Sequence, residues 1–408
     1  MTQTTRKWAG VAFGVLLLPL GGCEGFFDVE SPGRIADEDL NDVEAFPALV
    51  AGMSRSLTDA YDDMANATLP IVADELYHGG SYAITDIAKG IVLPEDVNGE
   101  WGSMHEARWV AESGIERMRG VYTEDEFASS ALVAEAYLWA GLSNRLLGEN
   151  VCAAVLDGGE EQPFSVHFQR GLDQFTQAIE IGGRAGEDDI VTAAYGGRAA
   201  MKAWLGDWAG AVQDAQEVPV DFVWDVLFNT GAGNGNQLYI ETHDRFEYTV
   251  FNTIYEAHPN DPRVPWDTVF NADGSIANGA NGTTPHYQQV KYTSEDSDDP
   301  AVKGTGMLVL RAEAALRNDD IPGAYLLMNE ARDFYGMAPL TPAASIEDAW
   351  DDLQFERGAT LWLEARRLWD LRRWFAAGPG SPEYHPFLED RATCIPISEE
   401  EVDSNPNI

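Results

Sequence analysis

The chain has 408 residues, with 68 Asp and Glu against 26 Lys and Arg, and therefore a formal net charge of −42. Its 45% hydrophobic and 11% aromatic residues are enough for a sizeable core, which excludes a globally disordered chain. So acidic a surface repels phosphate backbones, and no basic groove with interleaved aromatic residues accompanies it, which excludes nucleic-acid binding.

The first 22 residues have the order of a secretory signal peptide. Two basic residues precede an uncharged run from Trp8 to Leu20, which is shorter than the ~18–20 residues that span a bilayer. Leu20-Gly21-Gly22-Cys23 resembles a bacterial lipobox. The pattern predicts that residues 1–22 are removed and that acyl chains on Cys23 anchor the protein. Cleavage elsewhere, with Cys23 an ordinary residue, is the alternative.

Two cysteines remain if Cys23 is acylated, namely Cys152 and Cys394. An even number of cysteines in an exported protein predicts a disulfide between them. Two buried free thiols are the alternative, because two cysteines give no spacing pattern.

Helical periodicity is evident along the first half of the chain. Apolar residues at steps of three and four from Val43 to Met64 predict an amphipathic helix, with Pro47 near its first turn. Residues 127–148 and 164–182 are rich in Ala and Leu and have the same spacing.

Short polar turns follow three of the predicted helices, and after the last two of them a second helix resumes at once. This pattern predicts an all-α, mainly helical fold of tetratricopeptide-like helix hairpins. Unrelated antiparallel helix pairs are the alternative, because a full 34-residue period is not kept. The turns are residues 147–150, 205–211 and 317–324.

The segment 219–303 differs in character from its surroundings. It is rich in Gly, Asn and aromatic residues, and prolines at 259, 262 and 265 interrupt any helix. We expect an irregular, loop-rich insert with a few short strands. Because long loops on a rigid scaffold carry binding residues, this insert is the predicted location of function.

The last long helix is predicted at about 346–377. Aromatic and leucine residues recur along it at seven-residue spacing, and five arginines lie in the same segment. In so acidic a chain these arginines are expected to pair internally, with carboxylates such as Glu356, Glu364 and Asp370. The arginines are Arg357, Arg366, Arg367, Arg372 and Arg373.

No familiar catalytic or cofactor motif is present in the sequence. The seven histidines include no His-Glu-x-x-His pair, and neither a phosphate-binding Gly-rich loop nor a Gly-x-Ser-x-Gly elbow occurs. The acidic turns at 273–275 and 295–299 contain oxygen ligands that Ca²⁺ could use, but neither turn matches a known calcium-binding motif. We therefore predict no cofactor and no metal.

Several segments, in order from Cys23 to Ile408, resemble the SusD/RagB family of surface lipoproteins. The chain departs from that family by being shorter than many members and by its two further cysteines. The segments that carry the resemblance are Cys23–Pro32, Ala60-Tyr61, Asp261-Pro262-Arg263, Leu310–Ala314, Met328–Arg332, Glu356-Arg357, Glu364–Trp374, Ile395-Pro396-Ile397 and Asn405–Ile408.

The resemblance implies one SusD-like domain over 23–408, with a helical scaffold at 40–218 and 304–378 around the insert 219–303. It implies a non-enzymatic, lipid-anchored protein of the outer membrane, exposed at the cell surface. Such a protein binds nutrients, most often oligosaccharides and sometimes peptides, and delivers them to a SusC-type TonB-dependent transporter. A surface-anchored hydrolase and a tetratricopeptide-type scaffold for proteins are the alternatives.

A glycan-binding role predicts aromatic side chains that stack on sugar rings and polar side chains that bond the hydroxyls. The candidates all lie in the insert. They are Trp224, Tyr239, Tyr248, Trp266 and Tyr287 for stacking, with Asn236 and Asn281 as polar partners.

Overall fold

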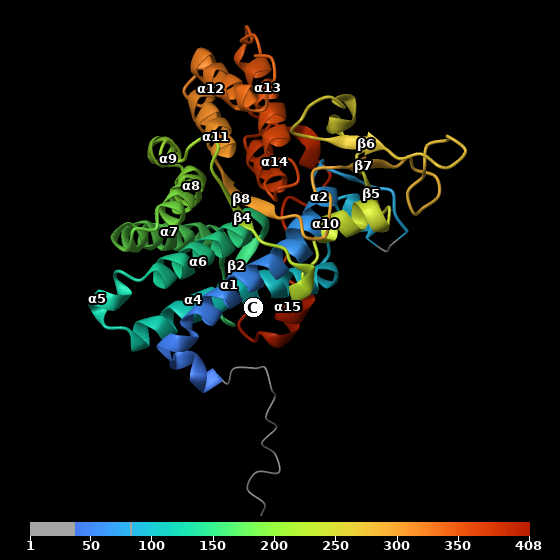
Figure 1. The fold of residues 1–408 in the computed structure, drawn as a ribbon. Coiled ribbons are helices and arrows are strands. Elements are labelled where there is room, and N and C mark those ends of the chain that lie inside the picture. Colours follow the sequence, from blue (N-terminus) through green and yellow to red (C-terminus); the bar gives the residue numbers. More distant parts are fainter. Residues whose placement is uncertain (1–36, 82–83) are drawn as a thin grey trace, which may run out of the picture.

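The protein is seen in a computed structural model that describes residues 37–81 and 84–408 (Figure 1). The predicted signal peptide and the predicted lipidation site, Cys23, lie outside these residues. Most of the regular structure is helical, and the strands form short two-stranded pairs, so the predicted fold class is confirmed. Across the described ranges, no helix combines the length and apolar character needed to cross a membrane.

The first predicted helix is present, but it begins three residues late. Residues before it form two 3-10 turns, η1 (Asp37–Asn41) and η2 (Val43–Ala45). α1 (Phe46–Ala60) has Pro47 in its first turn and continues through a π-helical stretch, η3 (Tyr61–Thr68), into α2 (Leu69–Val72). The late start leaves Val43 46% exposed, because only the residues from Phe46 onward face the core.

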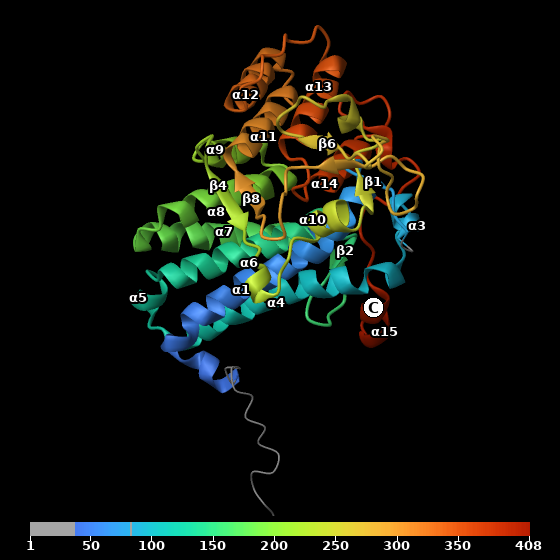
Figure 2. The ribbon, with the colours of Figure 1, turned by 45° about the vertical axis from the view of Figure 1, so that its right-hand side comes forward.

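The longer helices of the first half from α4 onward pack side by side in chain order, whereas α3 lies against α2 and β1 (Tyr77–His78) (Figures 1 and 2). Glycines allow three of them to approach closely: a Cβ on Gly141 or Gly197 would lie 2.7 or 2.4 Å from the ring of Phe175. The elements are α3 (Thr85–Ala88), η4 (Pro94–Val97), α4 (Asn98–Val121), α5 (Glu124–Phe127), α6 (Ala131–Asn150), β2 (Ala153–Val155), β3 (Glu161–Pro163), α7 (Ser165–Ala185), α8 (Asp188–Trp204) and α9 (Trp208–Ala215).

Two of the polar turns join helix hairpins as predicted. α8 turns into α9, and α11 (Gly304–Leu316) turns into α12 (Ile321–Phe334). Each second helix is capped by an aspartate of the turn, since Asp207 accepts from the Gly210 N–H and Asp320 from the Gly323 N–H, both at 2.9 Å. The turn after α6 leads instead into the β2–β3 hairpin.

The segment 219–303 contains short strands and helical turns; its first and last strands lie near the centre of Figure 1 and most of the rest at the right. All strand pairs in it are antiparallel: β4 (Val223–Val226) with β8 (Asp299–Lys303), β5 (Tyr248–Thr249) with β1 (Tyr77–His78), and β6 (Trp266–Thr268) with β7 (Tyr287–Gln289). Its helical turns are η5 (Thr230–Ala232), α10 (Gln237–Tyr239), η6 (Ile240–Asp244) and η7 (Ile254–Ala257).

The prediction of one helix over 346–377 is wrong. The chain forms α13 (Ile346–Thr360) and α14 (Arg367–Ala376), and Leu363 and Ala365 between them have a φ of +58°. The insert takes the backbone groups that a continuous helix would use, because Lys291 Nζ donates to the Trp362 carbonyl at 2.6 Å and Tyr292 Oη to the Leu363 carbonyl at 2.8 Å. Tertiary contacts therefore override the local helical pattern.

Four of the five arginines pair with carboxylates, as predicted, but Arg372 instead donates to the Val151 carbonyl at 2.9 Å. Arg367 binds Asp74 near the N-terminus and Arg366 binds Glu149 on α6, so the ion pairs join distant parts of the chain.

Of the three carboxylates predicted as partners, only Asp370 binds these arginines, namely Arg357 and Arg373. The prediction is wrong for the other two, because cations from elsewhere in the chain occupy them: Glu356 in α13 binds Arg263 and Arg332, and Glu364 in the break binds Lys291 and Lys303.

A disulfide joins Cys152 to Cys394, with Cα atoms 5.1 Å apart. The Cys152 N–H also donates to the Ile395 carbonyl at 2.9 Å. The last elements, η8 (Pro386–Leu388) and α15 (Glu399–Ser404), lie on either side of Cys394 in the sequence. The bond thus fixes the C-terminal segment against the end of α6.

Candidate functional site

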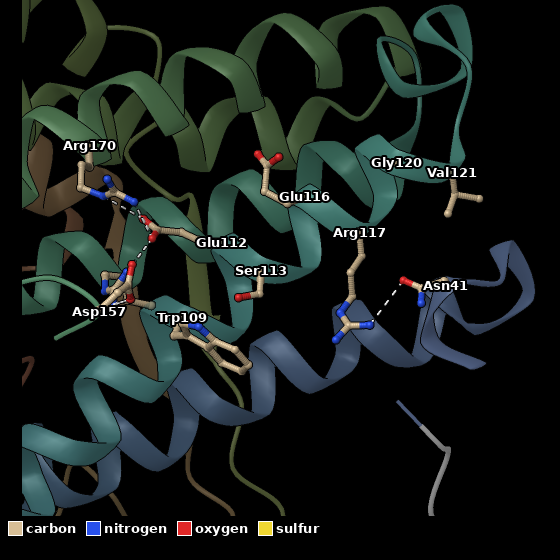
Figure 3. Close-up of a pocket in the computed structure, with 11 residues that line it drawn as sticks. Asn41, Trp109, Glu112, Ser113, Glu116, Arg117, Gly120, Val121, Asp157 and Arg170 are labelled. Carbon is tan, nitrogen blue, oxygen red and sulfur yellow. Dashed lines mark hydrogen bonds and ion pairs between the residues drawn. The ribbon is translucent and has the colours of Figure 1, made fainter. Parts of the chain in front are cut away.

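Two sizeable hollows lie on the described surface. One is an open groove of about 760 Å³ along α4, shown in Figure 3. The other, which we call the insert pocket, has a volume of about 520 Å³ and lies where the insert meets the segment after α2 and the C-terminal segment. The insert pocket is lined by Ile71, Ala73, Asp74, Leu76, Tyr77, His78, Thr85, Ala88, Lys89, Asn252, Thr253, Ile254, His385, Pro386, Phe387 and Arg391.

Strand pairing positions the first wall of the insert pocket. After α2 the backbone becomes extended at Ala73, and Tyr77 and His78 then pair with Thr249 and Tyr248 of the insert. The buried carboxylate of Glu247 accepts from the backbone N–H and the hydroxyl of Ser81, at 2.7 and 3.1 Å. The insert therefore holds the segment 77–81 by both backbone and side-chain bonds.

A row of aromatic rings leads from the pocket into the β6–β7 hairpin. Tyr77 is 41% exposed and contacts Phe251 edge-on, with ring centroids 6.0 Å apart. Phe251 lies 6.1 Å from Tyr287, which in turn lies 5.0 Å from Trp266. We call these four residues the aromatic row. It offers apolar ring faces and edges beside a pocket with polar groups.

Arg391 supplies positive charge to the pocket wall. Its Nη2 donates to the carbonyls of Ile71, Val72 and Ala88 at 2.9 to 3.3 Å, and its guanidinium lies 4.7 Å above the ring of Phe387. Within the part of the chain that the structure describes, no carboxylate forms an ion pair with it. Burial lowers the pKa of Arg391, but a guanidinium remains charged at neutral pH.

His385 is a neutral hydrogen-bond donor at the same wall. Burial, reinforced by the charge of Arg367, lowers the pKa of His385 to about 4. Its Nδ1 accepts from the Phe387 N–H at 3.3 Å, so the proton of the neutral ring lies on Nε2. The pocket thus has two kinds of donor, one charged and one neutral.

Asp74 is an acid of the pocket that is already fully engaged. Arg367 donates to both of its oxygens, at 2.6 and 2.7 Å. Burial acts to raise the pKa of Asp74, but Arg367 outweighs it, and the pKa lies below its usual value. Asp74 is therefore a fixed anion and is not placed as a proton donor.

The predicted stacking residues fall into separate groups. Trp266 and Tyr287 are half-buried neighbours in the aromatic row, with the Trp266 indole N–H donating to the Tyr255 carbonyl at 3.2 Å. Trp224 packs against Trp139 of α6, and Tyr239 stacks on His243 at 4.3 Å, so neither lines the insert pocket.

Two of the predicted contact residues are buried, so their assignment to a binding surface is wrong. Tyr248 is 2% exposed, and its hydroxyl donates to the Ala67 carbonyl at 2.5 Å. Asn236 is fully buried and caps α10, because its Oδ1 accepts from the Tyr239 N–H. Asn281 is exposed, but its Oδ1 accepts from the Thr283 and Thr284 N–H groups and so shapes the hairpin turn.

The sequence prediction missed the pocket residues outside the insert, such as Tyr77, His385 and Arg391. The only local signal was the run Tyr77-His78-Gly79-Gly80 a few residues after α2, where an aromatic and a polar residue precede two glycines. Nothing local to Arg391 indicates a site, since its role depends on carbonyls far away in the sequence.

In the two acidic turns considered for Ca²⁺, aspartate carboxylates accept hydrogen bonds from backbone N–H groups. Asp273 accepts from the Ser275 N–H at 3.0 Å, and Asp296 and Asp298 accept from the N–H groups of Thr230 and Phe228. No group of three or more His, Cys, Asp or Glu residues in the described ranges is arranged to hold a metal ion.

Comparisons with known proteins agree with this architecture. The sequence model of the SusD family matches residues 305–392. A comparison with curated protein sequences finds no match.

Solved structures resemble almost the whole chain. A SusD superfamily protein from Parabacteroides distasonis has 13% identity and a TM-score of 0.67, covering 92% of this chain and 98% of its own. One from Bacteroides thetaiotaomicron has 14% identity and a TM-score of 0.66, covering 90% and 98%. A SusD-like carbohydrate binding protein from Bacteroides vulgatus has 15% identity and a TM-score of 0.60, covering 80% and 82%.

The resemblance to the SusD family is thereby confirmed. It rests on the sequence match over 305–392 and on the fold of SusD superfamily proteins, which the chain shares along most of its length.

Proposed function

We propose that this protein is a cell-surface, nutrient-binding lipoprotein that captures oligosaccharides in the insert pocket and delivers them to a SusC-type TonB-dependent transporter of the outer membrane. The observation that carries the proposal is the aromatic row at the edge of a 520 Å³ pocket whose wall holds Arg391 and His385. The similar fold of a SusD-like carbohydrate binding protein supports the choice of ligand class.

Sugar rings match this combination of groups. The C–H face of a pyranose is apolar and packs on an aromatic ring, while its hydroxyls take hydrogen bonds from fixed donors. Tyr77 and Phe387 supply ring surface at the pocket, and Arg391 and His385 supply donors. The carboxylates nearby, Asp74 and Glu247, are held by other groups, which favours binding without hydrolysis.

Replacing Tyr77 by Ala is expected to weaken oligosaccharide binding about tenfold, because removal of an exposed stacking ring costs on the order of 1.4 kcal/mol. The measurement is titration calorimetry of the full-length protein with neutral hexasaccharides, followed by chromatography of the sugar.

The matched control for this experiment is Phe334→Ala, which removes a 47% exposed ring on α12, away from the pocket. It should leave the dissociation constant unchanged. Equal affinity of the Tyr77→Ala and wild-type proteins would contradict the proposed pocket. Shortened sugar products in the wild-type sample would favour the hydrolase.

The lipid anchor is tested at Cys23. Cells that express the chain and grow on radiolabelled palmitate should label the wild-type protein and leave Cys23→Ala unlabelled, because the acyl chains are attached through that residue. The labelled protein should fractionate with the outer membrane. Equal labelling of both chains, or of neither, would contradict the anchor.

A further inference from the structure

The groove along α4, which we call the α4 groove, lies apart from the insert pocket and shares no lining residue with it. One face of α4 forms its floor. Trp109, Ser113, Glu116, Arg117 and Gly120 recur at steps of three and four and therefore lie along the same side of the helix (Figure 3). The opposite side, with Met104, Ala111 and Met118 among others, packs into the core.

Trp109 is exposed in this groove to an unusual degree. Its side chain is 53% exposed, and no other tryptophan of the described residues is in the exposed class. An indole is a large apolar surface that proteins usually bury, so an indole left open on the floor of a groove of about 760 Å³ offers a ligand a ring face on which to stack.

A rigid polar wall stands beside this indole. Glu112 accepts from Arg108 at 2.7 Å, from Arg170 at 2.6 and 3.0 Å, and from Asn144 and Gln174 at 2.9 and 2.8 Å. Burial acts to raise the pKa of Glu112, but the bonds and charges of the two arginines keep the pKa below its usual value. Glu112 is therefore a fixed carboxylate with five donated bonds.

The wall continues onto the β2–β3 hairpin through Asp157. Arg108 donates to Asp157 at 2.7 Å, while the Asp157 side chain remains 61% exposed. Asp157 has a φ of +53°, a left-handed conformation that costs energy for a residue other than glycine, and the bond to Arg108 helps to hold it there. The carboxylate is thus presented to the groove in a fixed position.

The charges of the groove are balanced. Three arginines, at 108, 117 and 170, face three acids, at 112, 116 and 157, although the whole chain has a net charge of −42. A local surface without net charge neither attracts nor repels ions strongly, so it is suited to a neutral ligand that carries many hydroxyl groups.

We propose that the α4 groove is a second oligosaccharide-binding site, specific for neutral sugars, in which Trp109 stacks on a sugar ring. The exposed carboxylate of Asp157 accepts hydrogen bonds from hydroxyls, and the part-exposed guanidinium of Arg170 donates to them, while Glu112 holds Arg108 and Arg170 in place. The groove volume of about 760 Å³ lies within the range of small-molecule sites. Trp109 and Val121 are the large apolar residues among those that line the groove, and two such side chains are fewer than the core of a protein interface requires.

A second site on another face has a physical consequence for polymers. A glycan chain bound in the α4 groove remains held when the other site releases it, so rebinding becomes intramolecular and the overall affinity for long chains rises. Short sugars that reach only one site gain nothing from this effect.

The test follows the Trp109 side chain itself. The full-length protein, with its 12 tryptophans replaced by 5-fluorotryptophan, is titrated in a ¹⁹F NMR experiment with neutral hexasaccharides of glucose, xylose, mannose and galactose. Trp109→Phe and Trp266→Phe identify the resonances of the two residues. We expect at least one neutral sugar to shift the Trp109 resonance in a saturable way. The Trp109 variants lack this resonance, so their affinity for that sugar is measured by titration calorimetry, and Trp109→Ala should weaken the binding about tenfold.

Two variants separate the α4 groove from the insert pocket. Trp109→Phe keeps a stacking ring and should lose less affinity than Trp109→Ala, whereas Tyr77→Ala should leave the Trp109 titration unchanged. A Trp109 response without any response of Trp266 or effect of Tyr77→Ala supports the second site and contradicts the proposed function of the insert pocket.

Three results would overturn the proposal. They are a Trp109 resonance that no neutral sugar moves, one that moves only with an anionic sugar such as hexagalacturonate, and a response that disappears in Tyr77→Ala.

Discussion

Replacing Glu313 by Gln is expected to lower the free energy of unfolding by about 3–5 kcal/mol, the usual cost of breaking a buried ion pair from one side. The Glu313 side chain is fully buried and accepts from Arg373 at 2.5 and 3.1 Å and from Arg317 at 3.0 Å. Arg357 lies 3.8 Å away. Without the Glu313 carboxylate, the positive charges of these three guanidinium groups would be incompletely neutralised in the interior, which destabilises the folded state.

Urea unfolding followed by circular dichroism measures this cost. The matched control is Asp86→Asn, which breaks the exposed pair between Asp86 and Lys89, whose side chains are 67% and 62% exposed. Its effect should stay within about 0.5 kcal/mol, because exposed pairs contribute little. A loss below 1 kcal/mol for Glu313→Gln would mean that the interior is far more hydrated than the burial of Glu313 indicates.

The free energy of unfolding is also expected to peak near pH 6.5 and to fall by about 1.5 kcal/mol between pH 6.5 and 8. Three buried acids lose about 3 kcal/mol of stabilisation over this range, while the buried histidines, which are half-charged in the unfolded chain at pH 6.5, regain about half of it. Burial raises the pKa of Glu75 to about 8 and those of Asp62 and Asp299 to about 7. The folded protein therefore binds more protons at these acids than the unfolded chain. Their stabilising contribution is present at low pH and is lost as the pH rises through 7 and 8.

Buried histidines act in the opposite direction below pH 6.5. Burial lowers the pKa of His105 and His167 to about 3, and those of His286 and His385 to about 4. These rings are neutral in the folded protein and charged in the unfolded chain at acidic pH. Their stabilising contribution is present above about pH 6.5 and is lost as the pH falls toward 3 or 4, which more than offsets the gain from the three acids.

Glu75→Gln isolates the alkaline side of this profile. In the wild-type protein the Leu363 N–H donates to Glu75 Oε1 at 2.6 Å. Gln is neutral at every pH, and its amide oxygen can accept the same hydrogen bond. The variant should be more stable than the wild type by about 4 kcal/mol at pH 8 and by less than about 0.5 kcal/mol at pH 4.5. Parallel stability curves for the two proteins between pH 4.5 and 8 would contradict the assignment to Glu75.

The buried ion pairs also explain how the insert pocket is kept in shape. Asp74 on the pocket wall is bonded to Arg367 at the start of α14, and the Lys291 and Lys303 of the insert both bind Glu364 in the break before α14. The pocket is therefore supported by the C-terminal region, where the sequence match to the SusD family lies. We infer that disruption of these pairs affects binding as well as stability.

The helical scaffold could be predicted because its signals are local. The apolar spacing in α1 and the polar turns before α9 and α12 act within a few residues, and the aspartates at 207 and 320 cap the helices that follow them. The internal pairing of most arginines near 366 could also be predicted from the sequence. In a chain with few basic residues and many acids, a buried cation has a carboxylate within reach in most folds.

Only the tertiary structure decided which side chains meet at the two sites. The break at 361–366 depends on lysines and a tyrosine of the insert, and the insert pocket brings Tyr77 next to Arg391 from the opposite end of the chain. Trp109 lies on the polar side of α4 with Ser113, Glu116 and Arg117, so the helical period by itself places it away from the core. The groove around it depends on Asp157 and Arg170, which distant segments bring beside α4, and no local pattern encodes that packing.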